Sequence, residues 1–521
     1  MKVFVAIDSF KGAVGSAAAC RAAADALREA FALREAGGRL SAPAGSGRSA
    51  ASPADVREFP VSDGGEGFCE CIHHYLGGTW IPLPVTGPDG RTVEAKYLIA
   101  NGKAPANGSI FGTGGTAGTG NTSGTGDASP KTAFIESASA CGYTLVSGSS
   151  LDPHERDTDS PDRPDPREMT TAGVGELIAD AVSRGCTRII LGLGGTATMD
   201  AGLGLYNALR KAFPAAPDPN HCATLGDIEF TVCVDTFAPL TGPAGAAYMY
   251  GPQKGLRKDQ LAEADAWLSR QASRLGLSPV SASTTANHCT SAPLASTASA
   301  FATPTRFTTS TPGFGAAGGL LCGLTAALSL AAFSPDFVPT PSPDTRGSHI
   351  FDHFCDQHHP ESEGTGPTLK IVSGAEYLIE ISGLKEAIRE TGKDNILIIT
   401  GEGRVDEQSL TGKLTGRIAS LASSLNQDNN QGNKQENSHP VNHALNQGST
   451  QPTNQSSPLH STLPRSKVLC LAGSIGEGLD PKNSIFDEVL IITPEGTPLD
   501  KALAGTATNI RRTLLDYFSS K

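Results

Sequence analysis

The chain has 521 residues, of which 38% are hydrophobic, so it can bury a sizeable core, and its length predicts two or more domains. Lysine and arginine number 41 against 53 aspartates and glutamates, and the net charge of -12 argues against nucleic acid and anionic membranes as partners. Small molecules are therefore the expected ligands. The N-terminal stretch lacks the long apolar region and cleavage site of a signal peptide, so we expect a cytoplasmic protein without a membrane span.

Apolar runs of strand length alternate with helical segments along the chain. Uninterrupted apolar runs suit a parallel sheet that is covered on both faces, and the sequence therefore predicts the α/β class. A Thr pair at the start and Gly185 at the end delimit the clearest helical period. The expected strands are residues 1–7, 187–193, 395–400, 467–473 and 488–493, and the expected helices include residues 21–31 and 170–185.

The placement of these strands predicts the domain organisation. One strong strand lies at the N-terminus and three lie near the C-terminus, so we expect residues 1–75 and 316–521 to form a parallel-sheet domain, flavodoxin- or Rossmann-like, with residues 76–315 inserted as a second α/β domain. Between the periodic segments lie tracts rich in Gly, Ser, Thr, Pro, Asn and Gln, which are expected to be disordered insertion loops. These tracts are about 36–53, 102–130, 148–167, 284–312, 339–368 and 424–465.

Eleven cysteines without a repeated spacing do not indicate a disulfide framework. Two Cys/His clusters could in principle bind a metal. In CECIHH (69–74), neighbours two apart on a helix face different directions, so buried thiols are the favoured interpretation. HIFDHFCDQHH (349–359) lies in an irregular stretch and is interpreted as a solvated loop rather than a metal site.

Polar residues repeatedly follow the predicted strands, which is where open α/β sheets bind ligands. Asp8 and Ser9 could cap a helix, whereas Lys11 beside Gly12 suits an anion. The other clusters contain Gly194, Gly195 and Asp200 after residues 187–193, and Glu402, Arg404 and Asp406 after residues 395–400.

Several of these glycine-rich motifs allow two interpretations. GLGGTA (192–197) loosely matches a dinucleotide-binding fingerprint without its later acid, and its glycines allow either a close approach to phosphate or tight packing. SDGGEG (62–67) offers Asp63 and Glu66 as magnesium ligands, or it is a simple turn. YGPQKGL (250–256) places Lys254 in what could equally be an exposed turn.

The stretch LIITGEGRVDEQSLTGKLTG (397–416) fails as a P-loop. Eight residues separate Gly403 from Gly412, and Leu414 follows Lys413 where a P-loop has Ser or Thr. The acids, lysines and arginine in all these loops nevertheless suit phosphoryl transfer, which needs charge neutralisation, a metal and a positioned base.

A series of motifs resembles the bacterial type I glycerate kinases, in that family's order, over about residues 1–515. Departures within the motifs are small, such as Thr196 and Met199 where the family more often has Ser and Asn. The motifs are DSFKG (8–12), DGGEG (63–67), TTAGVGELI (170–178), LGLGGTATMDAGLG (191–204), PLTGPAGAAYMYGPQKG (239–255), GFGAAGGL (313–320), ITGEGRVDEQSLTGK (399–413) and LAGSIGEGL (471–479).

The resemblance implies ATP-dependent phosphorylation of D-glycerate with Mg²⁺, usually at the 2-hydroxyl, by two α/β domains with the site in the cleft between them. The product is expected to be 2-phosphoglycerate or 3-phosphoglycerate, and a homodimer is possible. The alternatives are an NAD-dependent dehydrogenase, resting on GLGGTA alone, and a non-catalytic protein that binds a small acid.

On this basis we expect the following roles. Lys11, Lys413 and the Gly194–Gly195 backbone would hold the ATP phosphates, assisted by Ser9 and Lys254. Asp63 and Glu66 would place magnesium, and Arg404 would hold the glycerate carboxylate by a two-pronged pair. Asp200 or Asp406 would accept the substrate proton, and Asp235 is a lesser candidate for the site.

Overall fold

The computed structural model describes two compact units. Unit 1 consists of Met1–Val61 and Ser382–Lys521, and unit 2 of Ser62–Ile381. No helix among the described residues is both long and apolar enough to cross a membrane. The described residues are 1–40, 55–101, 130–146, 164–214, 225–277, 308–329, 368–391, 396–411, 413–435, 466–476, 479–480 and 484–520.

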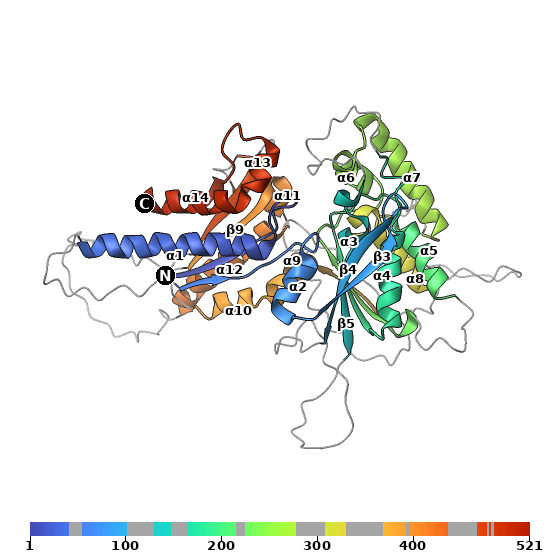
Figure 1. The fold of residues 1–521 in the computed structure, drawn as a ribbon, viewed down its shortest axis with the longest axis horizontal. Coiled ribbons are helices and arrows are strands. Elements are labelled where there is room, and N and C mark those ends of the chain that lie inside the picture. Colours follow the sequence, from blue (N-terminus) through green and yellow to red (C-terminus); the bar gives the residue numbers. More distant parts are fainter. Residues whose placement is uncertain are drawn as a thin grey trace, which may run out of the picture. The chain divides into compact units, whose positions relative to one another are not determined.

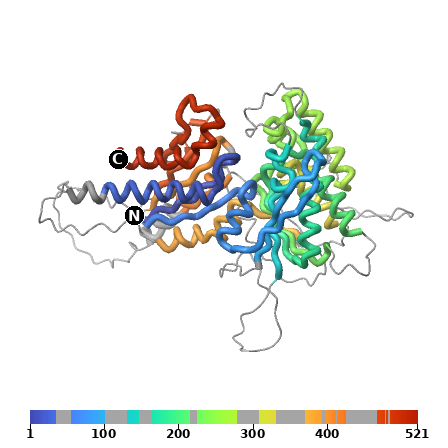
Figure 2. Tube along the Cα trace, in the orientation of Figure 1, coloured from blue at the N-terminus to red at the C-terminus, as the bar shows by residue number. Residues whose placement is uncertain are grey.

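Unit 1 is built on a five-stranded sheet in which every neighbouring pair is parallel. The order is β11-β10-β9-β1-β2, so the N-terminal strand lies inside the sheet beside strands from the C-terminal half of the chain (Figures 1 and 2). Counted along unit 1 alone, this order is 2-1-3-4-5, which is the flavodoxin-like arrangement. The strands are β1 (Lys2–Ile7), β2 (Asp55–Glu58), β9 (Ile396–Val405), β10 (Lys467–Ile475) and β11 (Glu488–Ile491).

Helices from both chain ends cover one face of this sheet. Val3, Val5 and Ile7 of β1 share a buried core with α1 (Ser16–Leu40) and α14 (Thr506–Ser520). Successive strand residues point to opposite faces, so buried residues between these, such as Phe4, belong to the other face. The remaining helices of unit 1 are α10 (Leu384–Arg389), α11 (Glu407–Thr411), α12 (Leu414–Gln435) and α13 (Leu499–Ala504).

Unit 2 contains a six-stranded mixed sheet in the order β3-β4-β5-β6-β7-β8. The pairs β3–β4 and β4–β5 are antiparallel, whereas β5 to β8 run parallel. The carboxyl ends of these four parallel strands therefore meet at one edge of the sheet. The strands are β3 (Thr79–Thr86), β4 (Thr92–Asn101), β5 (Lys131–Glu136), β6 (Arg188–Leu193), β7 (Glu229–Val234) and β8 (Thr368–Ser373).

Helices pack on both faces of the sheet of unit 2. The larger core joins alternate residues of β6 and β7 to α4 (Ala172–Ser183), α5 (Leu203–Ala212) and α8 (Leu320–Ser329). On the opposite face the rings of Phe68 and Tyr377, from α2 (Phe68–Leu76) and α9 (Gly374–Ile381), lie 6.1 Å apart. The remaining helices are α3 (Ala138–Cys141), η1 (Tyr143–Leu145), η2 (Leu225–Asp227), α6 (Ala246–Lys254), η3 (Lys258–Gln260), α7 (Leu261–Arg274) and η4 (Ala316–Gly318).

The α/β class and the parallel sheet built from both chain ends agree with the sequence expectation. The unit boundaries differ from the expected 1–75, 76–315 and 316–521, because residues 62–75 and 316–381 lie in unit 2. The physical reason is tertiary pairing, since β8 pairs with β7 and Leu320 to Leu328 of α8 join the core of unit 2. The strength of individual apolar runs does not reveal which sheet a strand joins.

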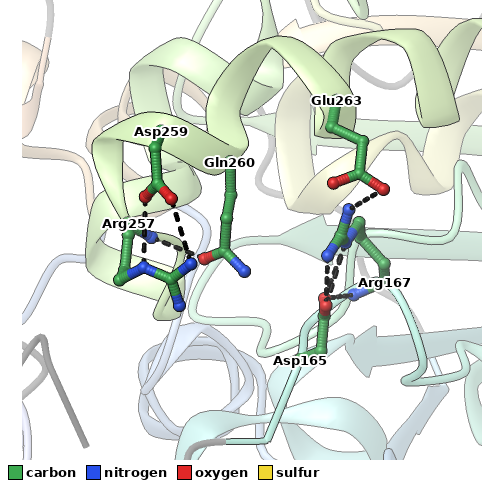
Figure 3. Close-up of polar contacts among 6 residues, drawn as sticks. All are labelled: Asp165, Arg167, Arg257, Asp259, Gln260 and Glu263. Carbon is green, nitrogen blue, oxygen red and sulfur yellow. Dashed lines mark hydrogen bonds and ion pairs between the residues drawn. The ribbon is translucent and has the colours of Figure 1, made fainter. Parts of the chain in front are cut away.

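The expected insertion loops lie mainly outside the described residues, but their described ends are structured. Residues 36–40 and 424–435 continue α1 and α12. Arg167 donates to Asp165 and forms an ion pair with Glu263 of α7, which anchors the end of the 148–167 tract (Figure 3). Figure 3 also shows a second pair, Arg257 with Asp259, at the turn before α7. These tract ends were wrongly expected to be disordered, because composition does not reveal such anchors.

Candidate active site

In unit 1 the strand order reverses between β1 and β9, and such a switch point is where doubly wound sheets bind ligands. The N–H of Asp8 donates to the carbonyl of Gly401 at 2.9 Å, which aligns the loop after β1 with the end of β9. A Cβ placed on Gly403 would meet only Phe10 Cα at 3.8 Å and the Lys11 nitrogen at 3.9 Å. The loop carrying Lys11 therefore lies directly beside Gly403.

A tight turn presents Lys11. Phe10 and Val14 exchange backbone hydrogen bonds of 2.9 and 3.0 Å, and Gly12 takes a left-handed φ of 72° between them. Lys11 is exposed at this turn, as an anion-binding lysine requires. Ser9, by contrast, is buried, and its N–H donates to Asp8 Oδ1 at 2.7 Å. Ser9 therefore supports the turn, and α1 begins only at Ser16, so neither Asp8 nor Ser9 is its N-cap.

Arg404 lies opposite Ser474 in the register of β9 and β10. Its Nε is buried and has no hydrogen-bond partner among the described residues. A buried guanidinium nitrogen without an acceptor is costly, so this position fits an anionic ligand that supplies one. This is the sharpest indication of a binding site in unit 1.

Asp406 and Lys413 lie close together after β9. The N–H of Asp406 donates to Ser409 Oγ at 3.0 Å and its Oδ1 accepts from the Ser409 N–H at 3.2 Å, which caps α11. Lys413 Nζ is 3.9 Å from Asp406 Oδ1, and the two side chains are 26% and 31% exposed. Thr415 donates to Glu402 Oε1 at 2.6 Å and so fixes the start of α12 just after Lys413. Gly412 lies outside the described residues.

In unit 2 the SDGGEG loop lies over the carboxyl ends of the parallel strands. Asp63 is buried and its Oδ1 accepts from the Gly65 N–H at 2.9 Å. A Cβ on Gly194 would lie 2.7 Å from Gly65 Cα, so Gly194 is required for close packing of two loops. The structure thus brings Asp63 and Gly65 to the Gly194–Gly195 turn.

Two further acids lie near the same turn. A Cβ on Gly195, which has a φ of 67°, would lie 4.0 Å from Glu66 Cβ. Asp235, at the end of β7, has its Oδ2 3.7 Å from the Cβ position of Gly194. Carboxylates beside a partly buried left-handed glycine can hold a hard cation together with phosphate oxygens.

The dinucleotide fingerprint lacks the structural context that it needs. The Gly194 N–H donates to Ser137 Oγ at 3.3 Å, and α5 does not begin until Leu203. A Rossmann fingerprint opens directly into its helix and leaves the backbone free for pyrophosphate. The spacing of GLGGTA is therefore explained by packing.

Asp200 is buried and saturated with donors. Oδ2 accepts from the Thr171 N–H, the Thr171 hydroxyl and the Gly204 N–H at 2.9, 2.9 and 3.0 Å, and Oδ1 accepts from the Gly202 N–H at 2.9 Å. Burial raises the pKa of Asp200, while these hydrogen bonds lower it. The carboxylate therefore joins the starts of α4 and α5. Because both of its oxygens already accept hydrogen bonds, it has little capacity to accept a proton from a substrate.

Lys254 is not placed as a phosphate-binding lysine in a surface turn. It ends α6, is 6% exposed, and donates to the carbonyls of Thr196 and Thr198 at 2.7 and 2.9 Å. Burial lowers its pKa to about 8. The turn signals of YGPQKGL do mark a chain reversal, at the left-handed Gly255, but α6 already includes Lys254 and directs it inward.

Glu136, at the end of β5, was missed by sequence reasoning. Oε1 accepts from the Gly67 N–H at 3.1 Å and Oε2 from the Cys69 N–H at 3.3 Å, so this carboxyl holds the start of α2 and the end of the SDGGEG loop. Burial raises its pKa to about 7. Its position as the last residue of an apolar strand is the signal that could have identified it.

The cysteine and histidine clusters form no metal site in the part of the chain that the structure describes. Cys69 and Cys71 are buried, whereas His73 and His74 are exposed. Among described residues no group of three or more His, Cys, Asp or Glu side chains is arranged to hold a metal ion. Residues 349–359 lie outside the described residues.

Comparison with known proteins gives consistent matches. A glycerate kinase of Bacillus subtilis (strain 168) is 30% identical over 280 residues, which cover 50% of this chain and 57% of that protein. A glycerate 2-kinase of Escherichia coli (strain K12) is 28% identical over 433 residues, which cover 80% of each chain.

The fold has a counterpart among solved structures. A crystal structure of a protein proposed to be glycerate kinase 2 of Salmonella typhimurium LT2 superposes with a TM-score of 0.51 at 22% identity, covering 100% of this chain and 98% of that one. At this identity the likeness shows the fold alone. The sequence profile of the glycerate kinase family matches residues 3–336 and 366–429, which is well over half of the chain. The chain therefore belongs to the glycerate kinase family.

Proposed function

We propose that this protein phosphorylates D-glycerate with ATP and Mg²⁺ to give 2-phosphoglycerate or 3-phosphoglycerate. Family membership supports the reaction, and the observation that carries the site assignment is the Nε of Arg404 in β9, which is buried and has no hydrogen-bond partner among the described residues. A planar guanidinium binds a carboxylate through two parallel hydrogen bonds, so Arg404 would orient glycerate.

Lysines of unit 1 would hold the ATP phosphates. Lys11 is exposed on a turn fixed by Phe10 and Val14, and Lys413 precedes α12 at a position fixed by the contact between Thr415 and Glu402. Hydrogen bonds of neighbouring residues hold the backbone near both lysines, which suits a reaction that depends on positioning and charge neutralisation. In unit 2, Gly195 would approach phosphate with its backbone, whereas Gly194 serves packing.

Asp63 and Glu66 would hold magnesium, directly or through water. The donor set fits, because Mg²⁺ prefers oxygen ligands and commonly takes only one or two carboxylates together with substrate phosphates and water. When bound, the ion would neutralise charge on the transferring phosphoryl group. Asp63 Oδ1 also orders its own loop, because it accepts from the Gly65 N–H at 2.9 Å.

Asp406 is the better candidate for the base. It is partly exposed and has a lysine 3.9 Å away, whereas both oxygens of Asp200 are occupied by backbone and hydroxyl donors inside the protein. Asp406 would accept the proton of the substrate hydroxyl as the oxygen attacks the phosphoryl group. Asp200 would then act through the loop that it organises.

Incubation of the full-length protein with ATP, magnesium and D-glycerate, with ADP release as the readout, tests this function. Steady ADP release that requires glycerate is expected, and product analysis would identify the phosphorylated oxygen. ADP release that does not depend on glycerate would contradict the substrate assignment, and glycerate binding without ADP release would favour a non-catalytic protein. Size-exclusion chromatography of the active protein would test whether it is a homodimer. The use of ATP favours a cytoplasmic location.

A further inference from the structure

Lys254 makes an unusually complete set of contacts for an internal lysine. Its Nζ donates to Thr196 O at 2.7 Å, Thr196 Oγ1 at 3.1 Å and Thr198 O at 2.9 Å. An ammonium group has three N–H donors and no acceptor, so these contacts use its full capacity. Burying a charge is costly unless it is compensated in this way, which indicates that the arrangement is specific.

The three acceptors belong to one short loop between β6 and α5. Other parts of unit 2 hold the amides of this loop, since Ala197 N–H donates to Cys141 O and Met199 N–H donates to Pro166 O, both at 2.8 Å. Lys254 therefore donates to carbonyl groups of the loop, while the carbonyls of Cys141 and Pro166 accept from its backbone N–H groups. The loop is fixed from both sides, between Gly195 at its start and Asp200 at its end.

We propose that Lys254 is a positioning residue that holds the loop of residues 195–200 from inside, so that the backbone of Gly195 is presented to the ATP phosphates without contact between Lys254 and ATP. The inference rests on the proposed function for the identity of the ligand. The mechanical role does not depend on the identity of the ligand, because all three contacts to the loop are made within the chain itself.

Lys254→Met in the full-length protein tests this role, because methionine keeps an unbranched apolar stem and removes all three donors. The matched control is Lys258→Met, since Lys258 is an exposed lysine four residues further along. Hydrogen–deuterium exchange in peptides covering 195–203 should become at least about tenfold faster in Lys254→Met, with exchange in β1 unchanged. Equal exchange rates in that segment for Lys254→Met and the control would overturn the proposal.

Kinetics separate positioning from general damage. Lys254→Met should raise KM for ATP by about tenfold or more while KM for glycerate stays within about threefold, because only the phosphate-binding loop is released. Equal increases in both constants, or none, would overturn the role. If wild type releases no ADP with glycerate, the proposed function fails, while the exchange experiment still decides the mechanical role.

Direct labelling distinguishes a positioning lysine from a phosphate ligand. A lysine-reactive acyl phosphate of ATP should acylate Lys11 or Lys413 in a manner that excess ATP prevents, and it should leave Lys254 unmodified. ATP-protected labelling of Lys254 would overturn the proposal.

If Lys254→Met does not fold, Thr196→Val supplies the same test more mildly. This change removes the hydroxyl acceptor and leaves both carbonyl acceptors in place. Exchange in 195–203 and KM for ATP should each rise by about two- to fivefold, in line with the loss of one hydrogen bond. Wild-type values for both would overturn the proposal.

Discussion

The carboxylate of Asp200 is joined to Thr171 by two hydrogen bonds, because Oδ2 accepts both the backbone N–H and the hydroxyl of Thr171 at 2.9 Å. Thr171 precedes α4, and the same oxygen accepts from Gly204 in the first turn of α5. One carboxylate therefore joins the N-terminal ends of two helices, which favours a negative charge there. This relationship gives Asp200 a structural role and so favours Asp406, the other candidate, as the catalytic base.

For Asp200→Asn we expect a loss of stability as the main effect. An amide offers one acceptor in place of two, so at least one buried donor loses its partner, and the free energy of unfolding should fall by about 1–3 kcal/mol. Chemical denaturation measures this, with Asp227→Asn, at an acid of the same unit outside this network, as the control. An unfolding curve identical to wild type would contradict the structural role.

For Asp406→Asn we expect loss of turnover with little loss of stability. The amide oxygen can still cap α11, but the side chain can no longer accept a proton, so kcat should fall by about 100-fold or more. Steady-state kinetics at saturating substrates and a thermal melt on the same sample check both parts. A wild-type kcat would remove Asp406 from the role of base.

The sequence was sufficient for the fold class and for a parallel sheet built from both chain ends, because apolar runs such as residues 395–400 and 467–473 suit a parallel sheet that is covered on both faces. It could not assign Thr368–Ser373 to the second sheet. That strand pairs with β7 across more than a hundred residues of chain, and only tertiary packing determines such a pairing.

For the candidate site, the sequence indicated polar clusters near the ends of strands, but not the exact ends of those strands or which side chains face inward. Lys11 lies in the loop after β1 as expected, whereas Arg404 lies within β9, which extends to Val405, and not in a loop after residues 395–400. Lys254 turned out to be internal because the helix α6 extends through a Gly-Pro pair that predicted a turn. Glu136 was overlooked although it ends a strand, since no motif marks an acid that binds backbone amides.

Glu136 predicts a pH dependence of stability. In the folded protein its pKa is raised by burial from 4.5 to about 7, so between these values the folded state keeps a proton that the unfolded chain has released. The stability that this carboxyl contributes is fully present below pH 4.5 and is lost as the pH rises to about 7.

Glu136→Gln should flatten this part of the profile, because the neutral amide does not titrate. Free energies of unfolding measured at pH 5 and pH 7.5 should differ less for Glu136→Gln than for wild type. Glu168→Gln, at an exposed acid of unit 2 that is not among the groups that shift the pKa of Glu136, should keep the wild-type difference. Parallel profiles for wild type and Glu136→Gln would show that another group carries the dependence.

Arg404→Lys tests which anion the buried Nε receives. Lysine keeps the positive charge but loses the planar fork, so a carboxylate held by two parallel hydrogen bonds would lose one of them. We expect KM for glycerate to rise by about tenfold or more with KM for ATP nearly unchanged, and Arg512→Lys, at an exposed arginine of the same unit, to leave both constants at wild-type values. A selective rise in KM for ATP would instead assign Arg404 to the phosphates. Because the Arg404 Nε is buried without a hydrogen-bond partner among the described residues, the variant tests which anion it binds. A selective effect on glycerate would mean that Arg404 binds the carboxylate while the lysines bind phosphate, and a selective effect on ATP would mean that all of them bind phosphate.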